Sequence, residues 1–430
     1  MTSPRRFESD LPAFLADLYL AGTPDYRDEL VRQTAHVRQR PAWTFPERWL
    51  PVELVSQRVP VTRLPLRQLG VLAVLALLLA AILVAYIGSR QQRLPAPFGV
   101  AGNGLIAYSA GGDIYSADQS GGVATAIVTG SETDVAPRFS HDGTLVVFER
   151  KLKYGAGQLY VAGSDGSQPT LITPEPIVLT ATESSISYDF SPDGRSVLFM
   201  SSKNGSPTMS IAQSDGGGVT ELDVGMLAER ASFRPPDGAE ILFHGRENLA
   251  SNFGVYAVDL GTGAVRPIVK PSVLRELTGA AWSPDGSRIL YWSWDNLRDD
   301  PAAKTHVVAA DGTGDRELPA PPDAVWNAVA AWSNDGTRIF LVRGYTSGGQ
   351  DVRPAVLPAD GSTVGVEIPL DRTAERDCCS AWTWSPDDSK ILGRPGGSTS
   401  DQVILDPVAG EFRLAPWTST SDPAWQRIAP

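Results

Sequence analysis

Residues 280–292 read AAWSPDGSRILYW, and this stretch decides the fold because it recurs along the chain. An apolar lead-in ends at Trp282, a Ser-Pro-Asp-Gly turn follows, and a run rich in aliphatic and aromatic residues comes next. An Asp-Gly step between two strand-forming runs is typical of a tight hairpin, because glycine tolerates the left-handed backbone and proline fixes the start of the turn. The stretch predicts two antiparallel strands joined by this turn.

The motif occurs six times, and a shortened copy ends the chain. It reads PRFSHDG from Pro137, YDFSPDG from Tyr188, SFRPPDG from Ser232, AAWSPDG from Ala280, AAWSNDG from Ala330, TWSPDD from Thr383 and PAWQR from Pro423. The aromatic residue of each copy, here called its anchor, is Phe139, Phe190, Phe233, Trp282, Trp332, Trp384 or Trp425, at intervals of 41 to 52 residues. Asp388 replaces the turn glycine in the sixth copy, and aspartate is among the residues that adopt the left-handed conformation.

A second turn follows each strand pair, as in GSDGSQ from Gly163 and AADGTG from Ala309, and a further short strand such as QLYVAG precedes most of these turns. Each repeat therefore has four short strands and two tight turns. Four-stranded units of about 40–50 residues arranged in a circle form a β-propeller. The sequence predicts an all-β, seven-bladed β-propeller over residues 102–430, with six blades as the alternative.

The two ends of this region complete one blade. The chain finishes at PAWQRIAP, an inner strand without following strands, and enters the domain at GLIAYSA and DIYSAD, which lack an inner partner. Pairing of the two would leave no open edge strand, which closed β architectures avoid. We therefore expect the last strand to close the ring against the first.

The W-S-P-D-G strand pairs resemble the propeller repeats of the TolB family, also called WD40-like β-propeller repeats, over about Gly104–Pro430. The resemblance implies the fold and its closure, and seven blades depart from the six usual in TolB domains. The segment PDYRDELVRQTAHVRQRPAWTFPERWLP from Pro24 resembles the cytoplasmic leader of bacterial membrane-anchored propeller proteins, some of which are labelled anti-sigma factors. Zinc-type anti-sigma modules carry a histidine and Cys-x-x-Cys, whereas this leader has His36 and no cysteine.

Residues 69–87, LGVLAVLALLLAAILVAYI, contain no charge and are close to the roughly 20 residues that cross a bilayer as a helix. Residues 1–98 contain 12 of the 37 basic and 8 of the 49 acidic residues, so the remainder contains 25 and 41. Because basic segments stay cytoplasmic, we expect a single-pass cell-membrane protein with residues 1–68 cytoplasmic, a linker over 88–101 and the propeller extracytoplasmic. With this excess of acidic residues, the propeller is a poor partner for nucleic acid, whose phosphates require a basic surface.

Only two cysteines occur, the adjacent Cys378 and Cys379. They exclude a disulfide framework, and two free thiols are the simpler interpretation, because a vicinal disulfide would strain the peptide between them. The propeller must therefore be held together by packing.

In an up-and-down blade, the first and third connections lie on one face of the ring, and the second and blade-to-blade connections lie on the other. Both tight turns thus share one face, the turn face. The longer, irregular connections share the opposite connection face, where binding residues concentrate. Aromatic residues and arginines are typical of interaction hot spots. The predicted binding residues are Arg246, Glu247, Trp294, Asp295, Trp326, Arg343, Tyr345 and Arg376.

The sequence carries no recognisable catalytic motif and implies no cofactor. The sequence contains no Gly-x-Ser-x-Gly nucleophile elbow. Its propeller histidines, His141, His244 and His306, do not follow the spacing of metal ligands. A metal-dependent polysaccharide lyase or hydrolase stays open as an alternative. Calcium binding by the repeat aspartates is the less favoured interpretation, because turn formation explains them. These residues, with a predicted structural role, are Asp142, Asp193, Asp237, Asp285, Asp335 and Asp387.

The leader predicts two short amphipathic helices, one with Leu11, Phe14, Leu15 and Leu18 on one side and one over residues 25–38. They could dock a cytoplasmic protein, lie on the membrane surface or pack against each other. We interpret the chain as a non-enzymatic binding, sensing or protein-interaction module, with an unknown protein or glycan ligand on the connection face. An enzyme and an anti-sigma-type regulator remain the alternatives.

Overall fold

The structure is a computed structural model that describes residues 98–178, 186–203, 206–272, 275–295, 303–345, 351–368, 380–394 and 400–429. The predicted leader, the apolar segment 69–87, the cysteine pair and Arg376 lie outside these residues, as does the side chain of Asp295. Within the described part of the chain, none of the helices has the length and apolar character needed to cross a membrane.

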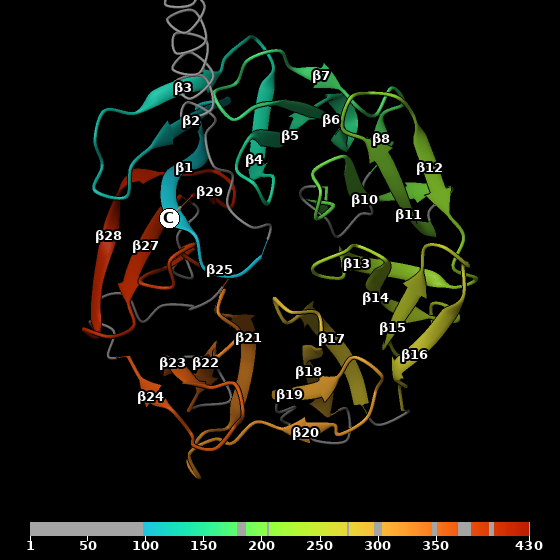
Figure 1. Cartoon of the computed structure of the whole chain (residues 1–430), viewed down its shortest axis with the longest axis vertical. Helices are drawn as coiled ribbons and strands as arrows, with labels where there is room; N and C mark the ends of the chain where they lie inside the picture. The colour runs from blue at the N-terminus through green and yellow to red at the C-terminus, as the bar shows by residue number, and fades with distance from the viewer. Residues whose placement is uncertain are drawn as a thin grey trace, which may run out of the picture. The chain divides into compact units, whose positions relative to one another are not determined.

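Six four-stranded sheets and one five-stranded sheet, all antiparallel, surround a central axis (Figure 1), so the predicted seven-bladed β-propeller is confirmed. Blade 1 contains, from the axis outward, β29 (Ala424–Ile428), β1 (Gly102–Ala110), β2 (Asp113–Ala117) and β3 (Thr125–Val128). Blade 2 contains β4 (Thr133–Phe139), β5 (Leu145–Lys151), β6 (Ala156–Gly163) and β7 (Thr170–Leu171), and β8 (Ile177–Val178) also pairs with β6. The 3-10 turn η4 (Lys153–Gly155) joins β5 to β6.

The remaining blades follow the same order. Blade 3 contains β9 (Tyr188–Phe190), β10 (Ser196–Lys203), β11 (Ser206–Gln213) and β12 (Val219–Leu222), and blade 4 contains β13 (Leu227–Phe233), β14 (Glu240–Arg246), β15 (Gly254–Asp259) and β16 (Val265–Val269). Blade 5 contains β17 (Arg275–Trp282), β18 (Arg288–Asp295), β19 (Ala303–Ala309) and β20 (Arg316–Glu317). Blade 6 contains β21 (Trp326–Trp332), β22 (Arg338–Gly344), β23 (Val352–Pro358) and β24 (Val366–Glu367), and blade 7 contains β25 (Ser380–Trp384), β26 (Ile391–Arg394), β27 (Asp401–Asp406) and β28 (Glu411–Thr418).

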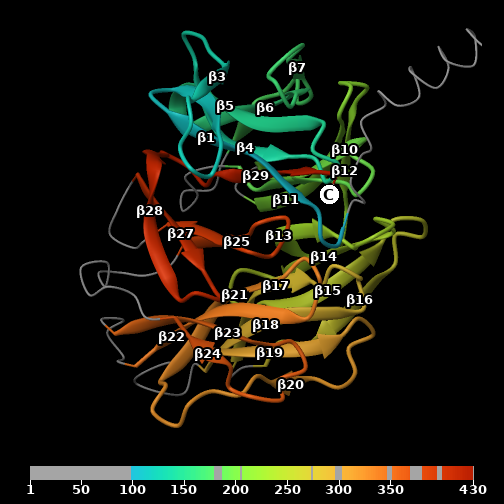
Figure 2. The same cartoon turned by 60° about the vertical axis from the view of Figure 1, so that its left-hand side comes forward.

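The last strand closes the ring, as predicted. β29 pairs antiparallel with β1, which places Trp425 opposite Ile106 and Ile428 opposite Gly102. The two ends of the domain therefore build blade 1 together, and Figure 2 shows β29 beside β1 in a second view. The inner edge that would otherwise be open is thus hydrogen-bonded.

The anchors fill the space between neighbouring blades. Trp282, which is 7% exposed, packs with Leu242 and Val255 of blade 4 and with Tyr291 of its own blade. The equivalent Trp332 also donates its indole N–H to the Ala281 carbonyl of the preceding inner strand, at 3.3 Å. An aromatic residue at this position therefore joins blades chiefly through buried apolar area, at about 25 cal/mol per Å².

The repeat aspartates accept hydrogen bonds within their own turns. Each carboxylate accepts the backbone N–H of the residue two positions later, at 2.9–3.1 Å. In the five turns that have a serine two positions before the aspartate, the carboxylate also accepts the serine hydroxyl, at 2.5–2.7 Å. Burial alone would raise the pKa of Asp285, but hydrogen bonds from Ser283 and Ser287 outweigh it and hold this pKa below its usual range. Gly286, at φ +65°, could not carry a Cβ, which would lie 2.0 Å from the Pro235 carbonyl oxygen.

The two departures from the repeat motif in blades 6 and 7 contact each other. Asn334 stands where most copies have proline, and Asp388, at φ 59°, stands where they have glycine. The Asp388 carboxylate accepts the backbone N–H groups of Asn334 (2.7 Å) and Asp335 (2.8 Å) and the Asn334 amide N–H (2.8 Å). Arg427 in β29 donates to the Asn334 side-chain oxygen at 3.0 Å. A proline at position 334 would lack the backbone N–H that donates, and a glycine at position 388 would lack the carboxylate that accepts. These hydrogen bonds therefore require both departures.

The chain reaches the propeller on the turn face. Arg427 donates to the Gly99 carbonyl at 2.7 Å, the Ala101 N–H donates to the Pro386 carbonyl at 2.9 Å, and the Phe98 ring lies 4.5 Å from the ring of His141. His141 and Pro386 belong to the first turns of blades 2 and 7. The segment that precedes β1 is therefore fixed to the turns rather than to the connections.

Candidate functional site

Two predicted binding residues lie at the connection-face end of blade 4. The Arg246 guanidinium lies 4.3 Å from the centre of the Phe253 ring and 3.6 Å from the Glu229 carboxylate, whereas Glu247 is exposed just after β14. Trp294, near the end of β18 in blade 5, is half-buried. Only Glu247 of these three is fully available to a partner.

Arg343 and Tyr345 meet in blade 6, where the structure differs from the sequence-based expectation. Arg343 is 0% exposed and belongs to β22, not to a surface loop, because its guanidinium bonds the Val364 carbonyl and lies 3.5 Å from the Glu367 carboxylate. The Tyr345 hydroxyl also bonds Glu367, and the Arg353 guanidinium stacks 4.1 Å from the tyrosine ring. Burial and the Glu367 carboxylate raise the pKa of Tyr345 to about 12. Arg343 thus supports the blade, and Tyr345 and Arg353 form its outer surface.

A pocket of about 390 Å³ opens between blades 5 and 6, and Trp326 is among the residues that line it. Lys304 and Glu317 form a 2.9 Å ion pair at the pocket, and their side chains are 48% and 45% exposed. Asn327 is 4% exposed and lines the pocket, and its side-chain oxygen has no hydrogen-bond partner within the described residues. Buried amide oxygens normally have partners, so a donor from a ligand or a water would complete the hydrogen bonding of this oxygen.

His244 ties blade 4 to blade 5. Its Nε2 accepts the Ala280 N–H at 2.9 Å, next to the irregularity in β17. Burial, helped by the Arg230 charge, lowers the pKa of His244 to about 3, so the ring is neutral at physiological pH. Its role is packing and one inter-blade hydrogen bond.

His306 lies in a buried polar network of blade 5 that has the composition of a catalytic triad. Its Nε2 is 3.2 Å from the Ser293 hydroxyl, and its Nδ1 is 3.4 Å from the Asp315 carboxylate. However, the Arg275 guanidinium is 2.8 Å from the same Nε2, Tyr291 stacks on the ring at 4.9 Å, and Ser293 is only 3% exposed. The arginine occupies the nitrogen that would act as a base, and a substrate has no access unless the blades separate.

Within the described ranges, no group of three or more His, Cys, Asp or Glu residues could hold a metal ion. The three histidines of the propeller lie in separate blades, and each contacts its own neighbours. His141 approaches the Phe190 carbonyl at 3.3 Å. The described residues therefore present no metal centre.

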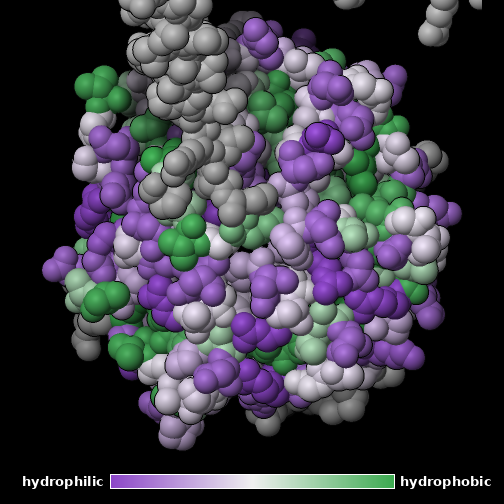
Figure 3. Space-filling view, viewed as in Figure 1, coloured by the Kyte–Doolittle hydropathy of each residue, from purple (hydrophilic) through white to green (hydrophobic). Residues whose placement is uncertain are grey.

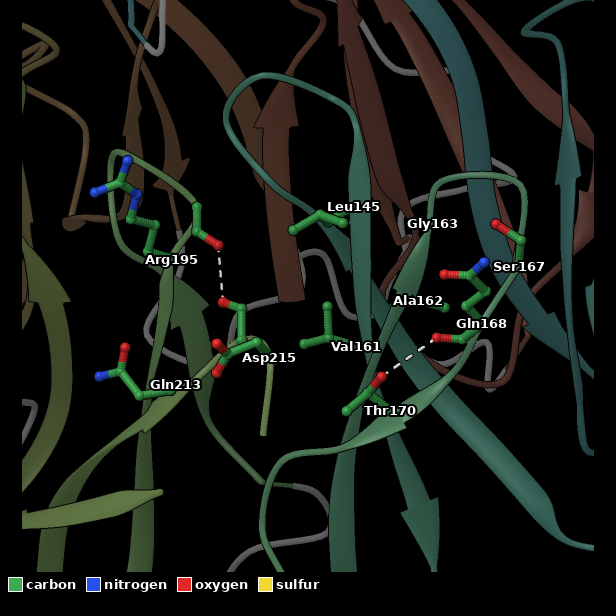
Figure 4. Close-up of a pocket in the computed structure, with 12 residues that line it drawn as sticks. Leu145, Val161, Ala162, Gly163, Ser167, Gln168, Thr170, Arg195, Gln213 and Asp215 are labelled. Carbon is green, nitrogen blue, oxygen red and sulfur yellow. Dashed lines mark hydrogen bonds between the residues drawn. The ribbon is translucent and has the colours of Figure 1, made fainter. Parts of the chain in front are cut away.

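A pocket of about 560 Å³ lies on the turn face between blades 2 and 3, where sequence reasoning placed no site. Figure 4 shows its apolar floor, with Leu145 and Val161, and its polar walls, with Gln168 and Thr170 on one side and Asp215 on the other. The sequence did contain a signal, because Leu145 and Thr170 stand where blade 5 has Arg288 and Arg316. On the face that Figure 3 shows, hydrophobic residues are scattered among hydrophilic ones, as is normal for a solvent-exposed surface.

No protein-family model and no curated protein matches the chain. Among solved structures, TolB from Acinetobacter baumannii is 20% identical over 64% of each chain, with a TM-score of 0.44. The β-propeller domain of the Trilobed protease from Pyrococcus furiosus, described as having an open velcro topology, is 15% identical over 74% of this chain and 98% of that domain, with a TM-score of 0.52. Oligogalacturonate lyase from Vibrio parahaemolyticus is 14% identical over 73% of this chain and 84% of that chain, with a TM-score of 0.51.

These likenesses concern the fold. The expected seven-bladed β-propeller is confirmed by the seven sheets and by the structural matches with TM-scores above 0.5. The proteins that share the fold include a lyase and a domain of a protease, so the fold alone does not separate binding from catalysis.

Proposed function

We propose that this chain is a membrane-anchored, non-enzymatic binding or sensing protein that holds a protein or glycan partner on the connection face of an extracytoplasmic propeller. The pocket between blades 5 and 6 carries the proposal, because it combines a tryptophan, a charged rim and the unpartnered oxygen of Asn327. Rigid scaffolds with such features on their connecting loops are typical of binding sites.

The attachment of residues 98–101 to the first turns of blades 2 and 7 occupies part of the turn face. The connection face is left free of this segment, and the pocket there has an accessible charged rim, formed by Lys304 and Glu317. Such a rim suits capture of a large partner.

The test uses variants of the full chain in intact cells, with charges reversed on the connection face or added on the turn face. One variant combines Glu247→Lys with Lys304→Glu on the connection face, and its matched control combines Ser362→Lys with Val408→Lys at exposed positions on the turn face. After chemical crosslinking and purification, quantitative mass spectrometry should show partners that are lost with the first variant and retained with the second. Retention with the first and loss with the second would contradict the proposal.

A metal-dependent lyase or hydrolase is the second candidate, and the fold-level likeness to oligogalacturonate lyase is what favours it. Elemental analysis of the purified full chain separates the two. A stoichiometric transition-metal or calcium ion that survives dialysis would favour the enzyme and count against the binding proposal.

A further inference from the structure

The pocket between blades 2 and 3 occupies the position that two arginines fill between blades 5 and 6. In blade 5, Arg288 immediately precedes the strand partner of the anchor Trp282, and its guanidinium donates to the Gly336 carbonyl at 3.0 Å and the Ala359 carbonyl at 3.3 Å in blade 6. Arg316 in the outer strand of blade 5 donates to the same Ala359 carbonyl at 3.0 Å. The cleft between blades 5 and 6 is therefore bridged by two guanidinium groups.

The pattern recurs at other clefts. Arg338 of blade 6 donates to the Asp388 carbonyl of blade 7 at 3.2 Å, Arg266 of blade 4 donates to the Ala310 carbonyl of blade 5 at 2.8 Å, and Arg413 of blade 7 donates to the Gln119 carbonyl of blade 1 at 2.8 Å. Carbonyl groups beside the two turns of a blade thus serve repeatedly as guanidinium acceptors. Such charge-assisted hydrogen bonds are about twice as strong as neutral ones.

Blade 2 lacks both arginines. Leu145 precedes the partner of the anchor Phe139, as Arg288 precedes that of Trp282. Thr170 pairs with Val161 as Arg316 pairs with Val307. Two short side chains therefore stand where two guanidinium groups stand in blade 5, and the cleft between blades 2 and 3 is hollow.

The acceptors remain in blade 3. By position in the motif, Gly194 corresponds to Gly336 and Ser214 to Ala359, and both line the pocket. The Gly194 carbonyl accepts the Ser214 hydroxyl at 2.8 Å, which leaves it a second lone pair. Within the described part of the chain, no donor reaches the Ser214 carbonyl. The pocket thus keeps the acceptors of a guanidinium site without its occupant.

The charge around this pocket suits a cation. Asp215 lines it and Asp165 lies in the adjoining turn, while Arg195 is 86% exposed and 3.9 Å from the Asp193 carboxylate. Figure 4 shows the Arg195 side chain pointing away from Leu145 and Val161 on the pocket floor. Hydrogen bonds from Ser167 lower the pKa of Asp165, which keeps this carboxylate ionised. Arg195 and Asp215 are the charged residues that line the pocket, and the carboxylates of Asp165 and Asp193 in the adjoining turns add negative charge around it.

We propose that the pocket between blades 2 and 3 binds an arginine side chain of a partner peptide, whose guanidinium replaces the missing internal arginines and donates to the Gly194 and Ser214 carbonyls. The apolar floor takes the methylene stem, as apolar surface commonly does for arginine. This site is separate from the connection face, so it adds a second contact to the proposed binding role.

The test measures binding of the peptide acetyl-Gly-Arg-Gly-amide to the purified full chain by calorimetry. The matched peptide with citrulline, which is nearly isosteric and uncharged, should bind about tenfold more weakly or not at all. Thr170→Arg should abolish binding and raise the melting temperature by about 1–2 °C, because the new side chain fills the cleft. Thr220→Arg, the same substitution in the corresponding position of blade 3, should leave peptide binding unchanged.

A reciprocal variant keeps the proposal testable if Thr170→Arg does not fold. Combining Arg288→Leu with Arg316→Thr removes both bridges between blades 5 and 6 and should create an additional arginine-specific site, which a second equivalent of bound peptide reports. Equal affinity for the arginine and citrulline peptides, no binding at millimolar peptide, or undiminished binding to Thr170→Arg would each overturn the proposal.

Discussion

Returning both departures of blades 6 and 7 to the repeat motif should destabilise the protein by less than the sum of the single changes. Asn334→Pro removes two of the three donors to Asp388 and the acceptor of Arg427, at a cost of about 3 kcal/mol. Asp388→Gly removes the carboxylate, but it also relieves the strain of a left-handed backbone at a non-glycine residue, which costs about 1 kcal/mol. The net loss of unfolding free energy should be about 2 kcal/mol. Because the variants lose two hydrogen bonds in common, the double variant should show a coupling energy of about 2 kcal/mol.

Urea unfolding of the full chain, followed by tryptophan fluorescence, measures this cycle. Proline occupies the position of Asn334 in four other copies of the motif, so its backbone is compatible with the turn. As a control, Pro284→Asn with Gly336→Asp transfers the pair to blades 5 and 6, where the Pro284 ring lies 3.7 Å from the Cβ position of residue 336. A favourable coupling is expected there too. Strict additivity of the original cycle, within about 0.3 kcal/mol, would refute the reasoning.

Three further predictions follow from the turns, the buried histidine and the leader. Because the pKa of Asp285 is lowered in the folded protein, its carboxylate stabilises the fold at pH values above the pKa of an unfolded aspartate, about 3.9. This stability is lost as the pH falls through the lower folded pKa. Asp285→Asn should therefore make the urea midpoint less dependent on acid pH. His244, with its pKa lowered to about 3, should make stability fall as the pH drops from 6.5 toward 3, and His244→Gln should remove this dependence; imidazole protonation seen by NMR near pH 6 would contradict the prediction. Residues 1–68 should capture a cytoplasmic protein in a pull-down, and recovery of no transcription protein would remove the support for the anti-sigma alternative.

Most of the fold could be predicted because its signals are local. The Asp-Gly turns, the alternating strands and the spacing of the anchors each depend on a few adjacent residues, and closure depends only on which strands lack a partner. The pairing of Trp425 with Ile106 follows from that count, although more than 300 residues separate them in sequence. The left-handed conformation of Asp388 could also be predicted from its place in the turn.

The sites could be predicted much less well, because burial and pairing depend on distant residues. Arg343 has the sequence context of a loop arginine, and only the position of Glu367, two strands away, shows that it is internal. The contact between Asn334 and Asp388 requires knowledge that successive turns touch. The turn-face pocket depends on what Leu145 and Thr170 lack, which becomes visible only once strand register aligns the blades.

Site-specific photocrosslinking in intact cells tests most directly whether partners use the connection face. A photoreactive amino acid replaces Glu247 or Lys304 on that face, and in parallel chains it replaces Ser362 or Val408 on the turn face. The account predicts a covalent adduct with the same partner from both connection-face positions and none from the two turn-face positions, which lie in blades 6 and 7, away from the pocket between blades 2 and 3. Adducts that form only from the turn-face positions would contradict it.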